Sequence, residues 1–247
     1  MKRTILFFAA FILAVSVSAQ VIKVAAAANL RNVLEEIKIE YLKENASDKV
    51  NVTFGSSGNL VQQILNGADF DFFMAADNEF PVKLKEKGAT TGEIRTYAFG
   101  KLVMWSGTLN VSQGDSLLLT PAVKKIAVAK PETAPYGNRT VEFLKRKRLF
   151  SKLEAKIVYA DNISQAAQFA YSGNAEIGFT AMSLVLTPEM LAAGKYYIVP
   201  ETDYTPIEQA CVLLKTYKHN PKAAKFMKFV LNPKLKPVWE KWGYKAG

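Results

Sequence analysis

Residues 21–34 read VIKVAAAANLRNVL, and this stretch decides the fold class. Residues 21–25 form a short apolar run that is typical of a buried strand. Further along, apolar residues recur every three or four positions, which is helical spacing. They are Leu30, Val33, Leu34, Ile37 and Tyr41. A loop of small residues joins the two segments, so the stretch predicts a strand that leads directly into a helix.

The same strand–helix unit recurs along the chain. Apolar strands are predicted at residues 50–54 and 70–75, with an amphipathic helix over residues 60–65 between them. A second set contains strands and helices in alternation, predicted at residues 125–129, 136–147, 156–159, 163–171 and 176–180. Such alternation predicts an α/β fold whose sheets are mostly parallel, with helices on both faces.

Two long extended stretches interrupt this alternation, at residues 97–106 and 207–214. We interpret them as segments that cross between two lobes. Residues 20–100 and 205–247 then form a discontinuous lobe one, and residues 101–204 form lobe two. Ligands of open α/β sheets bind at the carboxyl ends of the strands, so the ligand is expected in the cleft between the lobes.

Residues 1–19 have the layout of a cleaved signal peptide. Lys2 and Arg3 are followed by an uncharged apolar run over residues 5–15 and by small residues at 17–19. The mature chain is therefore expected outside the cytoplasm, in the periplasm or an equivalent compartment. Cys211 is the only cysteine, which excludes an internal disulfide and leaves no cysteine for a lipid anchor.

The formal net charge of +10 falls to +8 when Lys2 and Arg3 are removed with the signal peptide. A basic balance can indicate nucleic acid or an anionic ligand. The lysines are scattered, however, and the dense run at residues 145–148 lies at a predicted helix end, where positive charge complements the helix dipole. Export also argues against nucleic acid as a partner.

Enzymatic activity is not expected. His219 is the only histidine, so neither a Ser-His-Asp triad nor a histidine-rich metal site can be built. No Gly-x-Ser-x-Gly motif occurs. The carboxylates Asp69, Asp71 and Asp77 suggest a metal site, but caps and turns explain the first and third more simply. No cofactor is predicted.

Two loops share one design, AAAAN at residues 25–29 and GSSG at residues 55–58. Each places a neutral polar side chain, Asn29 or Ser57, at a helix N-terminus, where free N–H groups and the helix dipole favour anions. The simpler interpretation is that both residues are ordinary N-caps. Neither loop contains Lys or Arg. This pattern suits an oxyanion without protons, which needs donors and few acceptors.

Four segments together are similar to the periplasmic molybdate-binding protein family of ABC importers. They are VAAAANL at residues 24–30, FGSSGNLVQQI at 54–64, GADFDFFMAAD at 67–77 and KPETAPYGNRTVEFL at 130–144. The resemblance implies a two-lobed periplasmic-binding-protein fold that holds molybdate or tungstate between the lobes. It also implies delivery of this oxyanion to a membrane permease driven by a cytoplasmic ATPase.

The resemblance also implies a set of oxyanion ligands. They are Ala28, Asn29, Ser57, Tyr136 and Ile163, the last two through their backbone N–H groups. Some members add a tyrosine hydroxyl where this chain has Ala181, so that contact is absent here. Molybdenum or tungsten is held only as its oxyanion, and a monomer that contacts the membrane only through the permease is expected. Sulfate or another tetrahedral oxyanion remains the alternative cargo, because cavity size is not readable from sequence.

Overall fold

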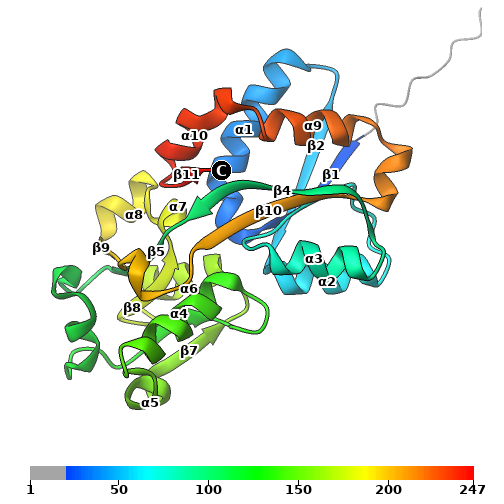
Figure 1. Cartoon of the computed structure of the whole chain (residues 1–247). Helices are drawn as coiled ribbons and strands as arrows, with labels where there is room; N and C mark the ends of the chain where they lie inside the picture. Colours follow the sequence, from blue (N-terminus) through cyan, green and yellow to red (C-terminus); the bar gives the residue numbers. More distant parts are fainter. Residues whose placement is uncertain (1–20) are drawn as a thin grey trace, which may run out of the picture.

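A computed structural model describes residues 21–247, and the predicted signal peptide lies outside this range. The described chain forms two sheets, each with helices packed against it (Figure 1). Among residues 21–247, no helix has the length and apolar character needed to cross a membrane. The predicted two-lobed α/β fold is confirmed.

The helices and strands have the following bounds. The strands are β1 (Val21–Ala27), β2 (Lys49–Gly55), β3 (Phe72–Met74), β4 (Thr90–Gly100), β5 (Leu102–Ser106), β6 (Ile126–Ala129), β7 (Ile157–Ala160), β8 (Ile177–Ala181), β9 (Lys195–Ile198), β10 (Ile207–Leu214) and β11 (Lys245–Ala246). The α-helices are α1 (Arg31–Glu44), α2 (Ser57–Leu65), α3 (Glu79–Glu86), α4 (Pro135–Arg146), α5 (Phe150–Leu153), α6 (Ile163–Tyr171), α7 (Met182–Val185), α8 (Pro188–Ala193), α9 (Lys222–Val230) and α10 (Lys236–Lys241). Short 3-10 helices are η1 (Ala28–Leu30), η2 (Val111–Leu119), η3 (Glu154–Lys156), η4 (Glu201–Asp203), η5 (Lys215–His219) and η6 (Pro233–Leu235).

The sheets are mixed, whereas the sequence predicted mostly parallel ones. The first sheet has the order β11-β4-β10-β3-β1-β2, and the second has the order β7-β6-β8-β5-β9. In each sheet the strands that belong to strand–helix units are parallel. Strands β4 and β10 in the first sheet, and β5 and β9 in the second, pair antiparallel to their neighbours. The difference arises because the crossing strands become members of the sheets.

Strands β4 and β10 run side by side between the two parts of the molecule (Figure 1). Strand β4 continues into β5 of the second sheet after a single residue, Lys101. On the return, Ile207 at the start of β10 pairs with Gly100 at the end of β4. The chain therefore enters and leaves the second sheet at one place, close to the positions at which the lobe boundaries were predicted; those boundaries themselves stay a prediction.

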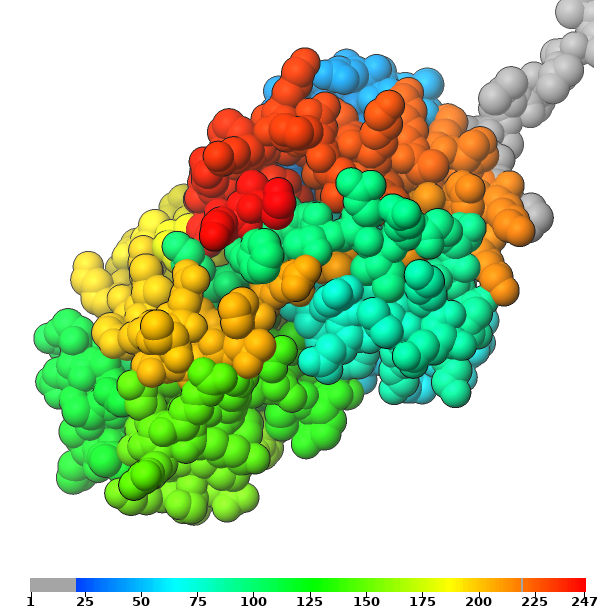
Figure 2. All heavy atoms as spheres, viewed as in Figure 1, coloured from blue at the N-terminus to red at the C-terminus, as the bar shows by residue number. Residues whose placement is uncertain are grey.

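Alternation along the strands of the first sheet places a core on each face. Ala25, Phe73 and Val212 pack with residues of α2 and α3, as one buried cluster. A larger cluster contains the residues that alternate with them, such as Met74 and Cys211, and extends into the second sheet. Figure 2 shows the two parts packed into one body, with the C-terminal residues (red) beside the crossing strand β4.

The three aspartates that suggested a metal site have structural partners. Asp69 is exposed and pairs with Lys23. Asp71 is buried and accepts hydrogen bonds from the Lys23 backbone N–H and the Asn220 side chain, each at 2.9 Å. Asp77 accepts from the Phe80 N–H at 3.1 Å. Residues 21–247 contain no group of three His, Cys, Asp or Glu side chains that could hold a metal ion.

Candidate functional site

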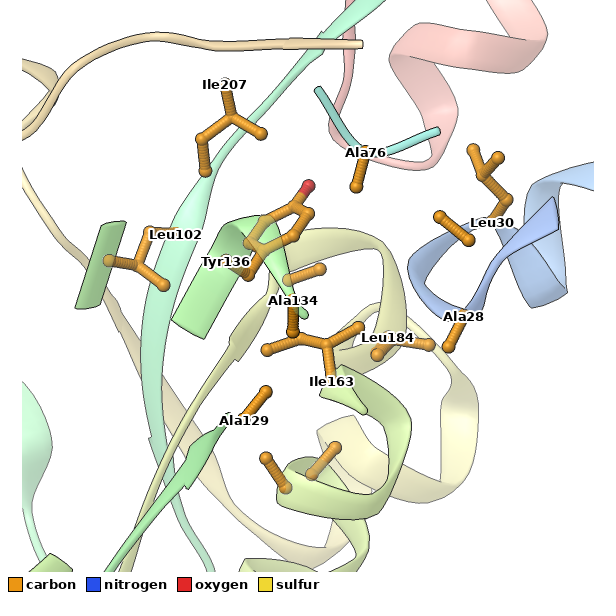
Figure 3. Packing of buried hydrophobic residues seen from close by; sticks show 14 of the residues in the cluster. Ala28, Leu30, Ala76, Leu102, Ala129, Ala134, Tyr136, Ile163, Leu184 and Ile207 are labelled. Carbon is orange, nitrogen blue, oxygen red and sulfur yellow. The ribbon is translucent and has the colours of Figure 1, made fainter. Parts of the chain in front are cut away.

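One small pocket brings together all five residues that the sequence predicted as oxyanion ligands. Its lining comes from the carboxyl ends of β1, β2 and β3 on one side and from the starts of α4 and α6 on the other. The lining residues are Ala27, Ala28, Asn29, Gly55, Ser56, Ser57, Ala76, Ala134, Pro135, Tyr136 and Ile163. Figure 3 shows several of these side chains, from different elements, gathered in one region. The empty space is about 200 Å3 including the open mouth, below the range of sites for drug-sized ligands.

The pocket is built from helix N-termini. Helix α2 begins at Ser57 and α6 at Ile163, while Tyr136 is the second residue of α4. First-turn N–H groups have no partner within their own helix. Among the hydrogen bonds of the described residues, none uses the backbone N–H of these three residues as a donor. The pocket therefore presents free N–H groups and the positive ends of helix dipoles.

Ser57 is not an ordinary N-cap, contrary to the simpler interpretation. Its Oγ accepts a hydrogen bond from the Ala76 backbone N–H at 3.0 Å, and it makes no bond to the first turn of its own helix. Ala76 follows β3, which is separated from β2 by β1 in the sheet. Because the oxygen is occupied as an acceptor, the hydroxyl hydrogen is free to be donated to a ligand in the pocket.

Asn29 is not an N-cap either, because the helix that contains it begins one residue earlier, at Ala28. The Asn29 side chain is fully buried. Its Nδ2 lies 2.9 Å from both Gln209 Oε1 and the Tyr244 hydroxyl. Its Oδ1 is buried and has no hydrogen-bond partner among the described residues. An unpaired buried amide oxygen at a pocket wall requires an explanation, because it costs free energy unless a ligand or a neighbour satisfies it.

The Tyr136 side chain is buried and makes a hydrogen bond of its own. Its ring is buried, with 1% of its surface exposed, and belongs to the core between the sheets. Its hydroxyl lies 3.0 Å from Gln209 Nε2. Burial raises the pKa of this phenol well above its ordinary value, so the hydroxyl keeps its proton. Sequence reasoning missed this role, because its partner lies 73 residues away.

Hydrogen bonds between the two sides close the pocket. The Ser164 hydroxyl donates to the Ala28 carbonyl at 3.0 Å, and the Ser183 hydroxyl donates to the Asn29 carbonyl at 2.8 Å. These bonds link residues of α6 and α7 to the loop at the end of β1. At the opposite wall, the backbone N–H of Gly58 donates to the Thr133 carbonyl at 2.8 Å.

Two polar residues of the site were not predicted. The Ser56 side chain lines the pocket, and its Oγ is buried without a partner among the described residues. Gln209 lies beneath the pocket, in the middle of β10, and is fully buried. Gln209 could have been identified from the sequence as a polar residue inside a largely apolar strand. Ser56 could have been identified only because it precedes Ser57.

No charged side chain lines the pocket. Asp77, the next residue after the lining residue Ala76, is 7% exposed. Burial raises the pKa of Asp77 to about 6. Arg139 of α4 lies 3.7 Å from Glu79 of α3, and neither residue of this ion pair lines the pocket. The residues that line the pocket are thus all uncharged.

Two α/β units joined by crossing strands, with a small uncharged pocket of helix N-termini between them, define a two-lobed protein of the kind that closes on a small ligand. The comparison with known families agrees with this class. The chain belongs to the bacterial extracellular solute-binding protein family, which matches residues 22–245.

The similar full-length proteins include two molybdate-binding proteins. The molybdate-binding protein ModA of Azotobacter vinelandii is 37% identical over 99% of this chain and 97% of its own length. ModA of Rhodobacter capsulatus is 36% identical over 94% and 91%, respectively. The solved structure of the Azotobacter vinelandii periplasmic molybdate-binding protein superimposes with a TM-score of 0.84 at 33% identity, covering 90% of this chain and 98% of that one. These matches confirm the family resemblance predicted from the sequence.

Proposed function

We propose that this protein captures molybdate or tungstate outside the cytoplasm and delivers it to an ABC permease. The observation that carries the proposal is the composition of the pocket. Three helix starts, whose first N–H groups donate no hydrogen bond among the described residues, and Ser57 line one small space that no charged side chain lines. Such a site holds a fully ionised oxyanion through hydrogen bonds and dipoles.

The same composition argues against ligands that carry protons. A hydrogen phosphate ion has a proton to donate and needs an acceptor in the site. The carbonyls of Ala28 and Asn29 already accept hydrogen bonds from Ser164 and Ser183. The unpaired oxygens that remain in the lining belong to the Asn29 amide and the Ser56 hydroxyl, and both of these groups can also donate. Molybdate and tungstate are fully deprotonated at neutral pH, so every ligand oxygen can accept a hydrogen bond. Ala28, Asn29, Ser57, Tyr136 and Ile163 are the proposed ligands.

Sulfate is the remaining alternative, since it has the same shape and charge. It is smaller, so a pocket closed around molybdate leaves some donors out of reach of its oxygens. Each buried donor left unpaired costs about 1–3 kcal/mol. The full-length relatives are named for molybdate, which favours the larger oxyanion over sulfate.

Delivery requires export and opening of the cleft. Residues 1–19 are the proposed signal peptide, and the mature chain is proposed to act as a periplasmic monomer. Residues 20–100 and 205–247 would move against residues 101–204 by bending of the crossing strands β4 and β10. We propose capture and release without chemical change of the oxyanion, and contact with the membrane only through the permease and its ATPase.

The test is isothermal titration of residues 20–247 with molybdate, tungstate, sulfate and phosphate. We expect one-to-one binding of the first two with Kd values at least a hundredfold lower than for the others. Tight binding of sulfate would keep the oxyanion site but reject the cargo. The absence of binding for all four anions would reject the proposed function. Ser172→Ala, a change on the exposed end of α6, serves as a control that should bind as the parent does.

A further inference from the structure

Gln209 connects the two sides of the pocket from below. Its side chain is fully buried in the middle of the crossing strand β10. The Oε1 atom lies 2.9 Å from Asn29 Nδ2 and 2.9 Å from the Tyr97 hydroxyl. The Nε2 atom lies 3.0 Å from the Tyr136 hydroxyl. The Gln209 amide therefore contacts both the loop at residues 25–29 and the start of α4.

The backbone around Gln209 leaves space for this contact. Gly100, at the end of β4, faces the point where Gln209 Nε2 meets the Tyr136 hydroxyl. Any side chain at this position would clash with both groups. The crossing strands thus supply both the amide and the space that it needs. The contact between Gln209 and Tyr136 therefore depends on a glycine at position 100.

The polar atoms of this network are not all paired when the two amides have the orientation given above. Asn29 Oδ1 is buried and has no partner, although Asn29 lines the pocket. The Tyr136 hydroxyl accepts from Gln209, but its own hydrogen has no acceptor among the described residues. Buried donors and acceptors are almost always paired, so two unpaired groups in one network are a strong signal.

Turning both amides over pairs these groups without moving any heavy atom, provided that the Tyr244 hydroxyl, which lies 2.9 Å from the same Asn29 atom, donates to Asn29 Oδ1. The Asn29 carbonyl then keeps the Ser183 hydroxyl as its donor. Gln209 Nε2 then donates to Asn29 Oδ1 and to the Tyr97 hydroxyl, while Gln209 Oε1 accepts from the Tyr136 hydroxyl. The Tyr97 hydroxyl keeps the Ala75 carbonyl, at 2.7 Å, as its acceptor. Amide oxygen and nitrogen occupy equivalent positions, so the surrounding hydrogen bonds decide the orientation. Asn29 Nδ2 now occupies the unpaired position and offers N–H groups to a ligand.

We propose that Gln209 is a positioning residue that turns the Asn29 amide so that its N–H groups, and not its oxygen, face the oxyanion. The proposal rests on the proposed function and extends it to specificity. With the nitrogen toward the ligand, Asn29 favours an anion without protons. With the oxygen toward the ligand, it would repel molybdate and accept the proton of hydrogen phosphate. Gln209 thereby determines which class of oxyanion the pocket accepts.

Two substitutions at position 209 separate positioning from packing. Gln209→Glu keeps the shape, and it is titrated at alkaline pH so that the buried carboxyl is ionised. The carboxylate then only accepts hydrogen bonds, so it holds Asn29 Nδ2 and turns Asn29 Oδ1 toward the ligand. Gln209→Met keeps the volume and holds neither orientation. We expect the molybdate Kd to rise about tenfold for Gln209→Met and at least about a hundredfold for Gln209→Glu. The ratio of phosphate to molybdate affinity should rise only for Gln209→Glu.

A second pair of variants controls for the negative charge that Gln209→Glu adds, by removing one carboxylate elsewhere on β10. The double variant Glu208→Gln/Gln209→Glu has the net charge of the parent, and Glu208 is half-buried beside Thr96, away from the pocket lining. It should bind as weakly as Gln209→Glu, whereas Glu208→Gln alone should bind as the parent does. In an Asn29→Ala background, Gln209→Met should change the Kd less than twofold, because the amide that it positions is gone.

The outcomes are distinct from those of the proposed function. If the parent does not bind molybdate, the proposed function fails. If the parent binds molybdate but Gln209→Glu and Gln209→Met have the same molybdate Kd, only the role of Gln209 is refuted. Ligand-free melting curves show whether each variant folds. Neutron diffraction from crystals of the parent with molybdate tests the orientation directly. Deuterium on the Asn29 atom that faces the oxyanion supports the proposal, and its absence overturns it.

Discussion

Replacing Ser57 with alanine tests the chemistry of the pocket most directly. Its Oγ accepts from the Ala76 N–H, which leaves one O–H for the ligand. The substitution therefore removes two hydrogen bonds that are measured separately. The bond to Ala76 exists without ligand, and its loss leaves a buried N–H unpaired in the folded chain. The bond to the oxyanion exists only in the complex.

The two losses have different expected magnitudes. An unpaired buried N–H lowers the free energy of unfolding by about 1–3 kcal/mol. The missing donor to a charged ligand weakens binding by about 1.5–3 kcal/mol, which raises the molybdate Kd by roughly tenfold to 150-fold. Melting curves without ligand measure the first loss, and titration with molybdate measures the second. Ser57→Thr keeps the hydroxyl and is the matched control for its chemistry.

A particular combination of results would refute this reasoning. If Ser57→Ala lowers the melting temperature but changes the molybdate Kd less than twofold, the hydroxyl serves only to hold Ala76. The pocket would then bind its ligand through backbone N–H groups alone. If Ser57→Thr is as weak a binder as Ser57→Ala, the added methyl group obstructs the pocket and the backbone groups must be tested by other means.

Three further predictions concern neighbouring residues. In Gly58→Ala the new methyl carbon would lie 2.9 Å from Thr133 Cα and 3.0 Å from the Phe80 ring. The first contact hinders closure, so titration should show a Kd at least fivefold higher, and the second overpacks α2 against α3, so the melting temperature of the ligand-free chain should also fall. Tyr136→Ala removes a buried ring and should lower the free energy of unfolding by about 3–5 kcal/mol in urea denaturation, whereas Tyr136→Phe should cost less than half as much. Burial raises the pKa of Asp77 to about 6, so its ionised form destabilises the fold at higher pH. Asp77→Asn should therefore raise the free energy of unfolding by about 1–3 kcal/mol at pH 8, with the gain fading as the pH falls through 6 and absent near pH 4; a gain that is equal at pH 8 and pH 4 would contradict this assignment.

The strands, helices and ligand loops were predictable because they depend on local patterns. Apolar runs and helical spacing located the strand–helix units, and small residues at two strand ends located the pocket. The N-cap interpretation of Ser57 was wrong, because the hydroxyl accepts a hydrogen bond from the Ala76 N–H, just after β3. The side-chain partners of Tyr136 were also beyond sequence reasoning, since Gln209 comes near it only through the crossing strand β10.

The position of β10 also bears on the order in which the chain folds. This strand lies between β3 and β4 in the first sheet, yet residues 101–206 separate it from β4 in the sequence. The second sheet, in contrast, is made from one continuous segment, so its contacts close shorter loops and should form first. The first sheet stays open at its centre until residues 207–214 arrive. For a chain that emerges from its N-terminus, we expect the first sheet to complete its folding only after residues 207–214 have emerged.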